Sequence, residues 1–237
     1  MEEHINLDKV KQLYDDLPCM WPEWDLWYAY THQYMHAYLK REVPRLNIQD
    51  TTKILNAGSG GNTYGIGGEH YHVDICWKNI AHLEHALQAS IEEMPYADGS
   101  FDGCICMGSV INYCDAKKAL FELARVIKPG GFFIFDFDQS GSLEYIFTKA
   151  FRKNAAIVDV ANSGYPDRIW VYSPRHIRSI LNAAGLAVRK MEYFHILSSF
   201  IKDDNKAAPF AKCDVILKHI PIIRSCSCNL ILTCRKL

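Results

Sequence analysis

The chain has 237 residues, of which 49% are hydrophobic and 22% are charged, and its formal net charge is −1. This composition is that of an ordinary globular protein, long enough to bury a substantial core within one domain. Lysines and arginines are scattered along the sequence, so we expect no nucleic acid and no membrane among its partners. A small molecule or a short peptide is favoured as the ligand of a monomer or homodimer.

The amino terminus and the cysteines predict a cytoplasmic protein. The first residues are acidic and lack the basic and apolar regions of a signal peptide. No apolar run approaches the roughly 18 residues that a membrane span requires. The pairs Cys104/Cys106 and Cys226/Cys228 have the spacing of residues that share one face of a strand, which predicts reduced thiols in the core. No spacing of cysteines and histidines predicts a metal site.

Residues 1–50 are predicted to be helical and are rich in aromatic side chains. From Trp27 to Tyr38 the rings recur at helical spacing, which is typical of a stripe packed against a core. So many aromatic rings ahead of the first strand also suit a lid that closes over a flat ligand. Both interpretations stay open, and under the second Trp24 and Trp27 are candidate substrate contacts.

The segments Lys53–Asn62 and Tyr71–Ile75 predict two neighbouring strands, the first followed by a glycine turn. Gly58 and Gly60 allow the backbone to bend sharply and to approach a ligand where a Cβ atom would collide. Asp74 lies 16 positions beyond Gly58, where a second parallel strand delivers an acid to the two hydroxyls of a ribose. This combination predicts a site for an adenosine group.

The remainder of the chain alternates between predicted strands and helices, as in an α/β fold. The stretch between Asp138 and Ser173 is expected to be irregular. The further elements expected, in chain order, are a strand at Ala86–Ser90, a strand at Ser100–Met107, a helix from Asp115 to Pro129, a strand at Phe132–Phe137, a helix from Ser173 to Gly185, and strands at Ala187–Leu197 and Asn229–Arg235.

Two longer motifs carry a family resemblance. Glu92–Asp102 is similar to an acidic-Leu-Pro-Phe, Asp-Gly-Ser-Phe-Asp motif that leads into a fourth strand, and Glu122–Gly131 to a helix that ends in Leu-Lys-Pro-Gly-Gly before a fifth. Ser173–Ile177 and Ala183–Leu186 resemble the same family's late helix. In these motifs, over about residues 50–200 and in its last strand, the chain resembles the class I S-adenosylmethionine-dependent methyltransferases.

The resemblance implies a fold and a division of the chain. The fold would be α/β and Rossmann-like, with a mostly parallel seven-stranded sheet and an antiparallel last strand. Residues 1–50 would form a helical, aromatic-rich lid segment, and residues 51–237 the methyltransferase domain, all within a single structural domain. Residues 198–228 would be an insertion near the substrate pocket.

The resemblance also implies S-adenosyl-L-methionine as the cofactor and S-adenosyl-L-homocysteine as its product. Gly58, Ser59 and Gly60 would line the methionine part, and Asp74 would hold the ribose. Met107 would lie at the end of the fourth strand beneath the sulfonium. The full set of cofactor contacts that we expect is Tyr28, Asn56, Gly58, Ser59, Gly60, Asn62, Asp74, Ile75, Ser90, Ile91, Met107, Gly108 and Ser109.

Three positions depart from the family's pattern. Asn56 stands where an aspartate or glutamate is usual, Asn62 replaces a third glycine, and Ser90 replaces an acid that reads the adenine edge. Two lost carboxylates weaken the electrostatic attraction for a cationic ligand. Neutral asparagine and serine side chains still hydrogen-bond to amines and hydroxyls, each bond contributing about 1 kcal/mol.

Methyl transfer from a sulfonium is an in-line displacement that depends chiefly on positioning. A neutral amine needs no base, whereas a hydroxyl or carbon acid benefits from one. Tyr113 and His195 are the candidate catalytic residues, although capping and packing remain open for both. The candidate substrate contacts are Trp24, Trp27, Asn112, Tyr113 and Asp138, because the last three follow strands at the edge of the sheet where ligands bind.

Our leading hypothesis is a methyltransferase that acts on a small molecule or short peptide by N- or O-methylation. A nicotinamide-dependent dehydrogenase shares the strand-glycine-strand beginning, but the Gly-x-Gly-x-x-Gly pattern fails at Thr63. A third possibility is a catalytically degenerate binding or activator subunit. The neutral residues Asn56 and Ser90 keep that alternative open.

Overall fold

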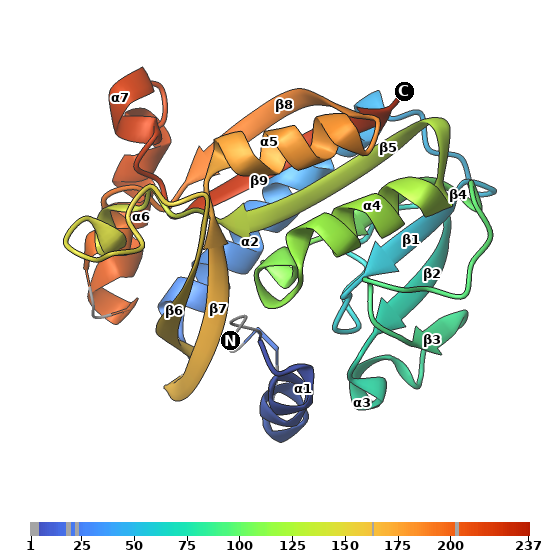
Figure 1. Cartoon of the computed structure of the whole chain (residues 1–237), viewed down its shortest axis with the longest axis horizontal. Coiled ribbons are helices and arrows are strands. Elements are labelled where there is room, and N and C mark those ends of the chain that lie inside the picture. Colours follow the sequence, from blue (N-terminus) through green and yellow to red (C-terminus); the bar gives the residue numbers. More distant parts are fainter. Residues whose placement is uncertain (1–4, 18–19, 22–23, 163, 202–203) are drawn as a thin grey trace.

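The computed structural model describes residues 5–17, 20–21, 24–162, 164–201 and 204–237. A seven-stranded sheet forms its centre, and a separate two-stranded hairpin stands beside it (Figure 1). The strands are β1 (Lys53–Ala57), β2 (Glu69–Asp74), β3 (Ala86–Gln88), β4 (Phe101–Cys106), β5 (Ile127–Asp138), β6 (Ala155–Asn162), β7 (Tyr165–Tyr172), β8 (Leu186–Phe194) and β9 (Asn229–Lys236).

The strands of the large sheet follow the order β3-β2-β1-β4-β5-β9-β8. β1, β2, β3, β4 and β5 pair in parallel, whereas β9 is antiparallel to both of its neighbours, β5 and β8. The predicted mostly parallel, seven-stranded sheet with an antiparallel last strand is therefore confirmed. Because the chain order reverses between β1 and β4, a crevice is expected at the carboxyl ends of these two strands.

Helices cover both faces of the sheet (Figure 1). The α-helices are α1 (Leu7–Asp16), α2 (Leu26–Glu42), α3 (Trp77–Ile80), α4 (Ala116–Val126), α5 (Pro174–Ala183), α6 (Asp204–Leu217) and α7 (Pro221–Arg224). Short 3-10 helices are η1 (Val43–Arg45), η2 (Val110–Tyr113), η3 (Leu143–Tyr145) and η4 (Ser198–Phe200).

The alternation of side chains along the strands separates two hydrophobic cores. In β1, Ile54 packs with Met35 and Leu39 of α2, whereas the next residue, Leu55, belongs to the core beneath α4 and α5. Successive side chains of a strand point to opposite faces, so one apolar run supplies both layers. The aromatic stripe of α2 faces the sheet as well, where Tyr38 is fully buried.

The helices begin where the sequence places caps. The Asp115 carboxylate accepts hydrogen bonds from the backbone N–H groups of Lys117 and Lys118 at the start of α4. The Ser173 hydroxyl accepts one from His176 N at the start of α5, directly before Pro174. Each such cap contributes about 1 kcal/mol to helix stability.

One prediction about the carboxy-terminal half is corrected. The stretch expected to be irregular contains the antiparallel hairpin of β6 and β7, in which Ile157 pairs with Trp170. The two strands are joined next to Gly164, whose φ is +84°. Residues 198–228, which we expect to be an insertion near the substrate pocket, contain η4, α6 and α7.

α6 is tied to α2 and to the end of β8. The Tyr30 hydroxyl donates to the carbonyl of Ala211 at 3.0 Å. The Asp214 carboxylate accepts from the backbone N–H groups of Ile196 and Leu197 at 2.7 and 2.9 Å. None of the helices in the described segments has both the length and the apolar character needed to traverse a bilayer.

Candidate functional site

A cavity opens at the carboxyl edge of the sheet, next to β1, β2 and β4. Its volume is about 930 Å³ including the part open to solvent, which is within the usual range of small-molecule sites. Ten of the residues expected at the site line it, namely Tyr28, Gly58, Ser59, Asp74, Ile75, Ser90, Ile91, Met107, Gly108 and Tyr113.

The glycine turn after β1 forms the floor of the cavity. The N–H of Gly58 donates to the carbonyl of Val73 at 2.7 Å, which fixes the turn against the end of β2. Gly58 has a φ of +66°, and a Cβ atom there would lie 2.5 Å from a methyl group of Val110. Only glycine fits this backbone and this spacing.

Asp74 is held in place by backbone donors on both carboxylate oxygens. Its Oδ2 accepts from Gly60 N at 2.9 Å and its Oδ1 from Cys76 N at 2.8 Å. Burial raises the pKa of the Asp74 carboxyl above its ordinary value, and these backbone bonds oppose that rise. Each carboxylate oxygen accepts more than one hydrogen bond, so Asp74 retains the capacity to accept from hydroxyl groups of a ligand in the cavity.

The walls of the cavity are mostly apolar. Ile75, Ile91, Met107 and Val110 contribute aliphatic surface from the ends of three strands. Among the lining residues in the described segments, Asp74 is the only one with a formal charge at neutral pH. Such walls suit a flat, uncharged ring, and the single acid suits a neighbouring pair of hydroxyls.

α1 lies against the cavity, and its side chains were not among the residues expected at the site. Leu7, Val10 and Tyr14 line it from this helix. The helix is tied to the other wall, because Lys78 Nζ donates to the carbonyl of Asp15 at 2.6 Å. The available signal was the helical spacing of Leu7, Val10 and Tyr14 after Asn6, whose side chain caps α1.

Tyr113 links α1 to the β6–β7 hairpin. The Tyr14 hydroxyl donates to the Tyr113 oxygen at 3.1 Å, and the Tyr113 hydroxyl donates to Asp167 Oδ2 at 2.6 Å. Burial, with the nearby Tyr14 and Asp167, raises the pKa of Tyr113 well above its ordinary value. The phenol stays protonated at neutral pH, so this geometry favours a positioning role for Tyr113 over that of a phenolate base.

Met20 and Trp21 also line the cavity and were not predicted. A Cβ atom at Gly60 would lie 2.6 Å from Met20 Cε, so this side chain packs on the glycine turn. The Trp21 ring stacks on His32 with centroids 5.0 Å apart. His32 in turn contacts Asn62 Nδ2 at 2.7 Å, so Asn62, expected to be a cofactor contact, anchors this aromatic layer and does not line the cavity.

Asn56 and Ser109 do not line the cavity either. Asn56 is buried, and its Nδ2 donates to the carbonyl of Asn62 at 2.5 Å within the turn. The Ser109 hydroxyl contacts Asp136 and Asp138 behind the cavity. Both side chains lie beneath the loops and support them. Their geometry does not favour direct contact with a cofactor.

Asn112 and Asp138, expected at the substrate, form part of the same buried scaffold. The Asn112 amide donates to the carbonyls of Asp138 and Trp170 and accepts from Asp138 N. The Asp138 carboxylate accepts from Ser109 Oγ at 2.7 Å and from Asn229 Nδ2. Their side chains join η2, β5 and β9 rather than the wall of the cavity.

His195 is buried and Trp27 packs on its ring, a geometry that does not favour the roles expected for them. Trp27 stacks on the His195 ring with centroids 3.7 Å apart. His195 is fully buried, and its two ring nitrogens contact Thr31 and Ser198. Burial lowers the pKa of His195 to about 3, which leaves it a weak base. Trp24 is 69% exposed and lies outside the cavity.

The buried carboxyls behind the cavity predict a stability that falls as pH rises. Burial raises the pKa of Asp136 to about 7 and that of Asp138 to about 6, from 3.8. Between pH 4 and 7 the folded protein therefore holds protons on these carboxyls that the unfolded chain has released. The resulting contribution to the unfolding free energy is complete below about pH 4 and is lost as pH rises to 7.

Asp136→Asn, which cannot ionise, should remove much of this dependence. We expect the unfolding free energy of the variant, relative to that of the wild type, to increase by about 1–4 kcal/mol between pH 4 and 8. Urea unfolding across this range measures it. A difference between the two proteins that stays constant with pH would contradict the expected titration.

Comparison with known proteins places this fold and cavity in a family. Residues 50–135 match the family described as methyltransferase domain. This segment contains β1 to β4, the glycine turn, Asp74 and most of β5. This match supports the resemblance to the class I S-adenosylmethionine-dependent methyltransferases that the sequence motifs predict.

Individual relatives share only part of the sequence. A malonyl-[acyl-carrier protein] O-methyltransferase of Buchnera aphidicola is 38% identical over 111 residues, covering 42% of this chain and 44% of the relative. The uncharacterized protein MJ1252 of Methanocaldococcus jannaschii is 26% identical over 151 residues, covering 61% and 58%. The chain thus spans about half the length of the curated relatives that it matches.

The fold extends further than the sequence similarity. A crystal structure of geranyl diphosphate C-methyltransferase from Streptomyces coelicolor superposes with a TM-score of 0.61. The match covers 97% of both chains at 11% sequence identity, so it establishes the fold alone. That structure is a complex with Mg²⁺, geranyl diphosphate and S-adenosyl-L-homocysteine.

Proposed function

We propose that this protein transfers a methyl group from S-adenosyl-L-methionine to a small molecule or short peptide. The observation that carries the proposal is the convergence of the Gly58 turn and the Asp74 carboxylate on one mostly apolar cavity. The named relatives methylate oxygen in one case and carbon in another. Nitrogen or oxygen remains our expectation for the acceptor atom.

The residues of the cavity fit the cofactor. Asp74 would accept hydrogen bonds from the ribose hydroxyls, while Ile75 and Ile91 would contact the adenine ring. Gly58 and Ser59 would lie along the methionine part, with Tyr28 and Met107 at the other wall. When bound, the cofactor supplies a methyl group activated by its positively charged sulfur.

The protein's own contribution is positioning and the exclusion of water. α1, Met20 and Trp21 cover the cavity with apolar surface, which keeps water from the reacting groups. Holding two reactants in line contributes about 7–11 kcal/mol to catalysis in favourable cases. A buried, protonated Tyr113 would offer a fixed hydrogen-bonding partner rather than a base.

Calorimetric titration with S-adenosyl-L-methionine and S-adenosyl-L-homocysteine tests the proposal. We expect dissociation constants in about the micromolar range, near −8 kcal/mol, and no binding of NADH. Transfer of a radiolabelled methyl group to an extract of small molecules and peptides would then reveal an acceptor. Binding of NADH instead of either compound would favour the dehydrogenase alternative.

A binding or activator subunit is the second candidate, because Asn56 and Ser90 are neutral where the family usually has acids. The Asn56 Oδ1 atom is buried and has no hydrogen-bond partner among the described residues. Absence of binding to both compounds would favour this candidate. Binding of both, followed by methyl transfer to any acceptor, would exclude it.

The hydrogen bond between Tyr14 and Tyr113 is expected to hold α1 against the cavity. Tyr14→Phe removes one hydroxyl and leaves the edge-to-face ring contact, whose centroids are 5.8 Å apart. The loss of about 1 kcal/mol should accelerate cofactor dissociation by about fivefold. Stopped-flow displacement of S-adenosyl-L-homocysteine measures the rate.

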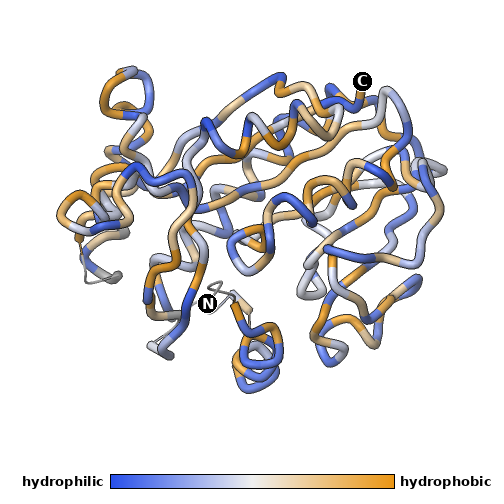
Figure 2. The backbone as a smooth tube through the Cα atoms, in the orientation of Figure 1, coloured by the Kyte–Doolittle hydropathy of each residue, from blue (hydrophilic) through white to orange (hydrophobic). Residues whose placement is uncertain are grey.

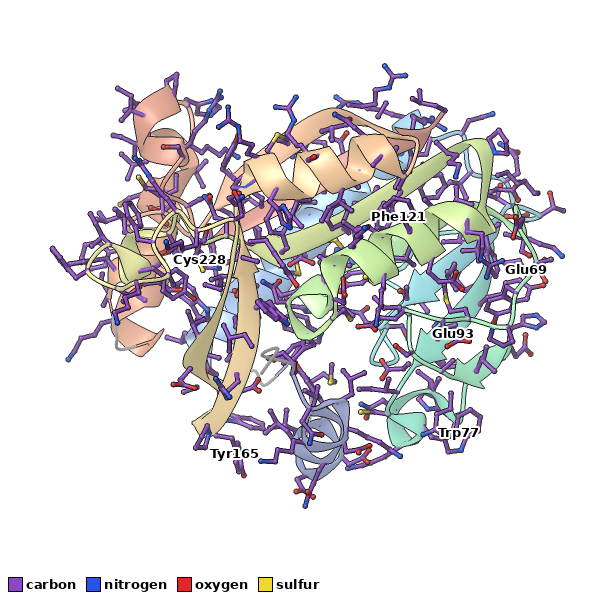
Figure 3. All side chains as sticks on the ribbon, viewed as in Figure 1. Glu69, Trp77, Glu93, Phe121, Tyr165 and Cys228 are labelled. Carbon is purple, nitrogen blue, oxygen red and sulfur yellow. The ribbon has the colours of Figure 1, made fainter. Side chains whose placement is uncertain are left out.

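Tyr165→Phe provides the matched control, since this tyrosine lies at the exposed tip of β7 (Figure 3). Its dissociation rate should equal that of the wild type. If S-adenosyl-L-homocysteine dissociates from Tyr14→Phe at the wild-type rate, α1 does not control its dissociation from the cavity.

A further inference from the structure

Exposed hydrophobic side chains are concentrated at one end of the molecule. Fifteen large hydrophobic side chains are exposed among the described residues, and nine of them lie within residues 143–153 and 197–226. The most exposed are Phe147 at 89%, Ile222 at 81% and Ile216 at 73%. Contiguous exposed apolar surface usually marks a binding surface.

These two segments are adjacent in space, and we call them the α6–α7 end. The N–H of Leu143 donates to the carbonyl of Cys226 at 3.2 Å, and the hydroxyls of Ser142 and Ser199 are 3.4 Å apart. Figure 1 shows α6 and α7 beyond the carboxyl ends of β5 and β8. Figure 2 shows hydrophobic stretches along both helices.

The same end carries an excess of positive charge. Residues 143–153 and 197–226 contain eight lysines and arginines and four acids, in a chain whose net charge is −1. One of the acids, Asp214, is buried against the backbone of η4. Lys149, Lys212 and Arg224 are exposed among the apolar side chains. The surface therefore combines protruding apolar groups with positive charge.

We propose that the α6–α7 end binds the surface of an anionic lipid bilayer. Lysine and arginine side chains are attracted to anionic headgroups, and phenyl and aliphatic groups enter the boundary between headgroups and acyl chains. Attachment is peripheral, with Phe147, Ile216 and Ile222 as the inserted groups. We expected no membrane partner from the sequence, because only folding brings the two basic segments together.

Charge argues against a second copy of the chain on this surface. A twofold interface places the same patch on both subunits, so the lysines and arginines would face one another. The composition also differs from a typical protein interface, whose energetic centre is rich in Trp, Tyr and Arg. The side chains that protrude farthest here are Phe147, Ile216 and Ile222, which carry no polar group.

Co-sedimentation of the full-length protein with lipid vesicles tests the proposal. We expect vesicles with about 30% phosphatidylglycerol to bind it at least about tenfold more tightly than pure phosphatidylcholine, and salt to reduce that binding. The triple variant Phe147→Ser, Ile216→Ser, Ile222→Ser should lower binding to the anionic vesicles by about tenfold or more.

A matched triple variant changes exposed hydrophobic residues elsewhere. Trp77→Ser, Phe121→Ser and Leu237→Ser alter side chains on α3, on α4 and at the carboxyl terminus, the first two of which are labelled in Figure 3. This variant should bind vesicles like the wild type. Thermal unfolding confirms that both variants are folded.

Three results would overturn the proposal. The first is equal binding of the wild type to anionic and zwitterionic vesicles. The second is an equal loss of binding in the two triple variants. The third is a dimer, detected by light scattering, that the Phe147, Ile216 and Ile222 substitutions dissociate while vesicle binding is absent. The inference does not depend on the methyltransferase activity, because vesicle binding is measured without cofactor or acceptor.

Discussion

Replacing Asp74 by alanine should weaken the binding of S-adenosyl-L-methionine at least about tenfold, because hydrogen bonds to a carboxylate contribute about 1.5–3 kcal/mol each. The change also frees the backbone N–H groups of Gly60 and Cys76, which Asp74 now holds. Asp74→Asn retains the size of the side chain but presents an amide N–H toward one of these donors. Calorimetry should therefore show a loss in both variants, larger for alanine.

The ribose provides a sharper test of this role. Adenosine should bind the Asp74→Ala variant more weakly than the wild type, whereas adenine, which lacks the hydroxyls, should bind the two proteins about equally. Asp159→Ala is the control, since this carboxylate is exposed on β6 and far along the chain from the cavity. Equal losses for adenine and adenosine would show that the substitution has disturbed the whole cavity and that Asp74 does not read the sugar.

Replacing Gly58 by alanine should both destabilise the fold and remove cofactor binding. A non-glycine residue at a φ of +66° costs about 1–2 kcal/mol, and the collision with Val110 adds about 1–3 kcal/mol. For a protein of this length, the melting temperature should fall by about 5–15 °C. Differential scanning calorimetry measures the fall, and titration at 10 °C below the new midpoint measures the loss of binding.

Gly65 provides a control that separates strain from collision. Its φ is +61°, almost the same as that of Gly58, but no atom lies within 4 Å of the position of its Cβ. Gly65→Ala should therefore lower stability by about 1 kcal/mol and leave binding unchanged. In the double variant Gly58→Ala, Val110→Ala the collision is relieved, so part of the stability should return. A Gly58→Ala variant no less stable than Gly65→Ala would contradict the close packing of the turn.

The sheet was predictable because its signals are local. Apolar runs mark β1, β4 and β5, Asp115 and Ser173 cap the next helices, and glycines mark the turns. The number of strands and their directions followed from the family's motifs and not from the runs themselves. The hairpin was missed because neither strand alternates cleanly between apolar and polar residues, and Pro166 interrupts the second.

The candidate site was predictable where it follows a strand end and unpredictable where it depends on distant packing. Gly58, Asp74 and Met107 lie directly after strands and line the cavity. Tyr14 and Trp21 belong to no strand of the sheet and reach the cavity only through tertiary packing. The burial of His195 was unpredictable for the same reason, since nothing in the sequence beside it indicates that Trp27 covers its ring.

The position of α1 sets a limit on how fast the protein can work. Its attachments to Cys76 and Lys78 run to the main-chain carbonyls of Lys11 and Asp15, so they survive most substitutions within the helix. Under the proposed function, spent cofactor leaves past this helix before a fresh molecule enters. The opening rate of α1 is then a ceiling on turnover, however well the groups inside the cavity are aligned.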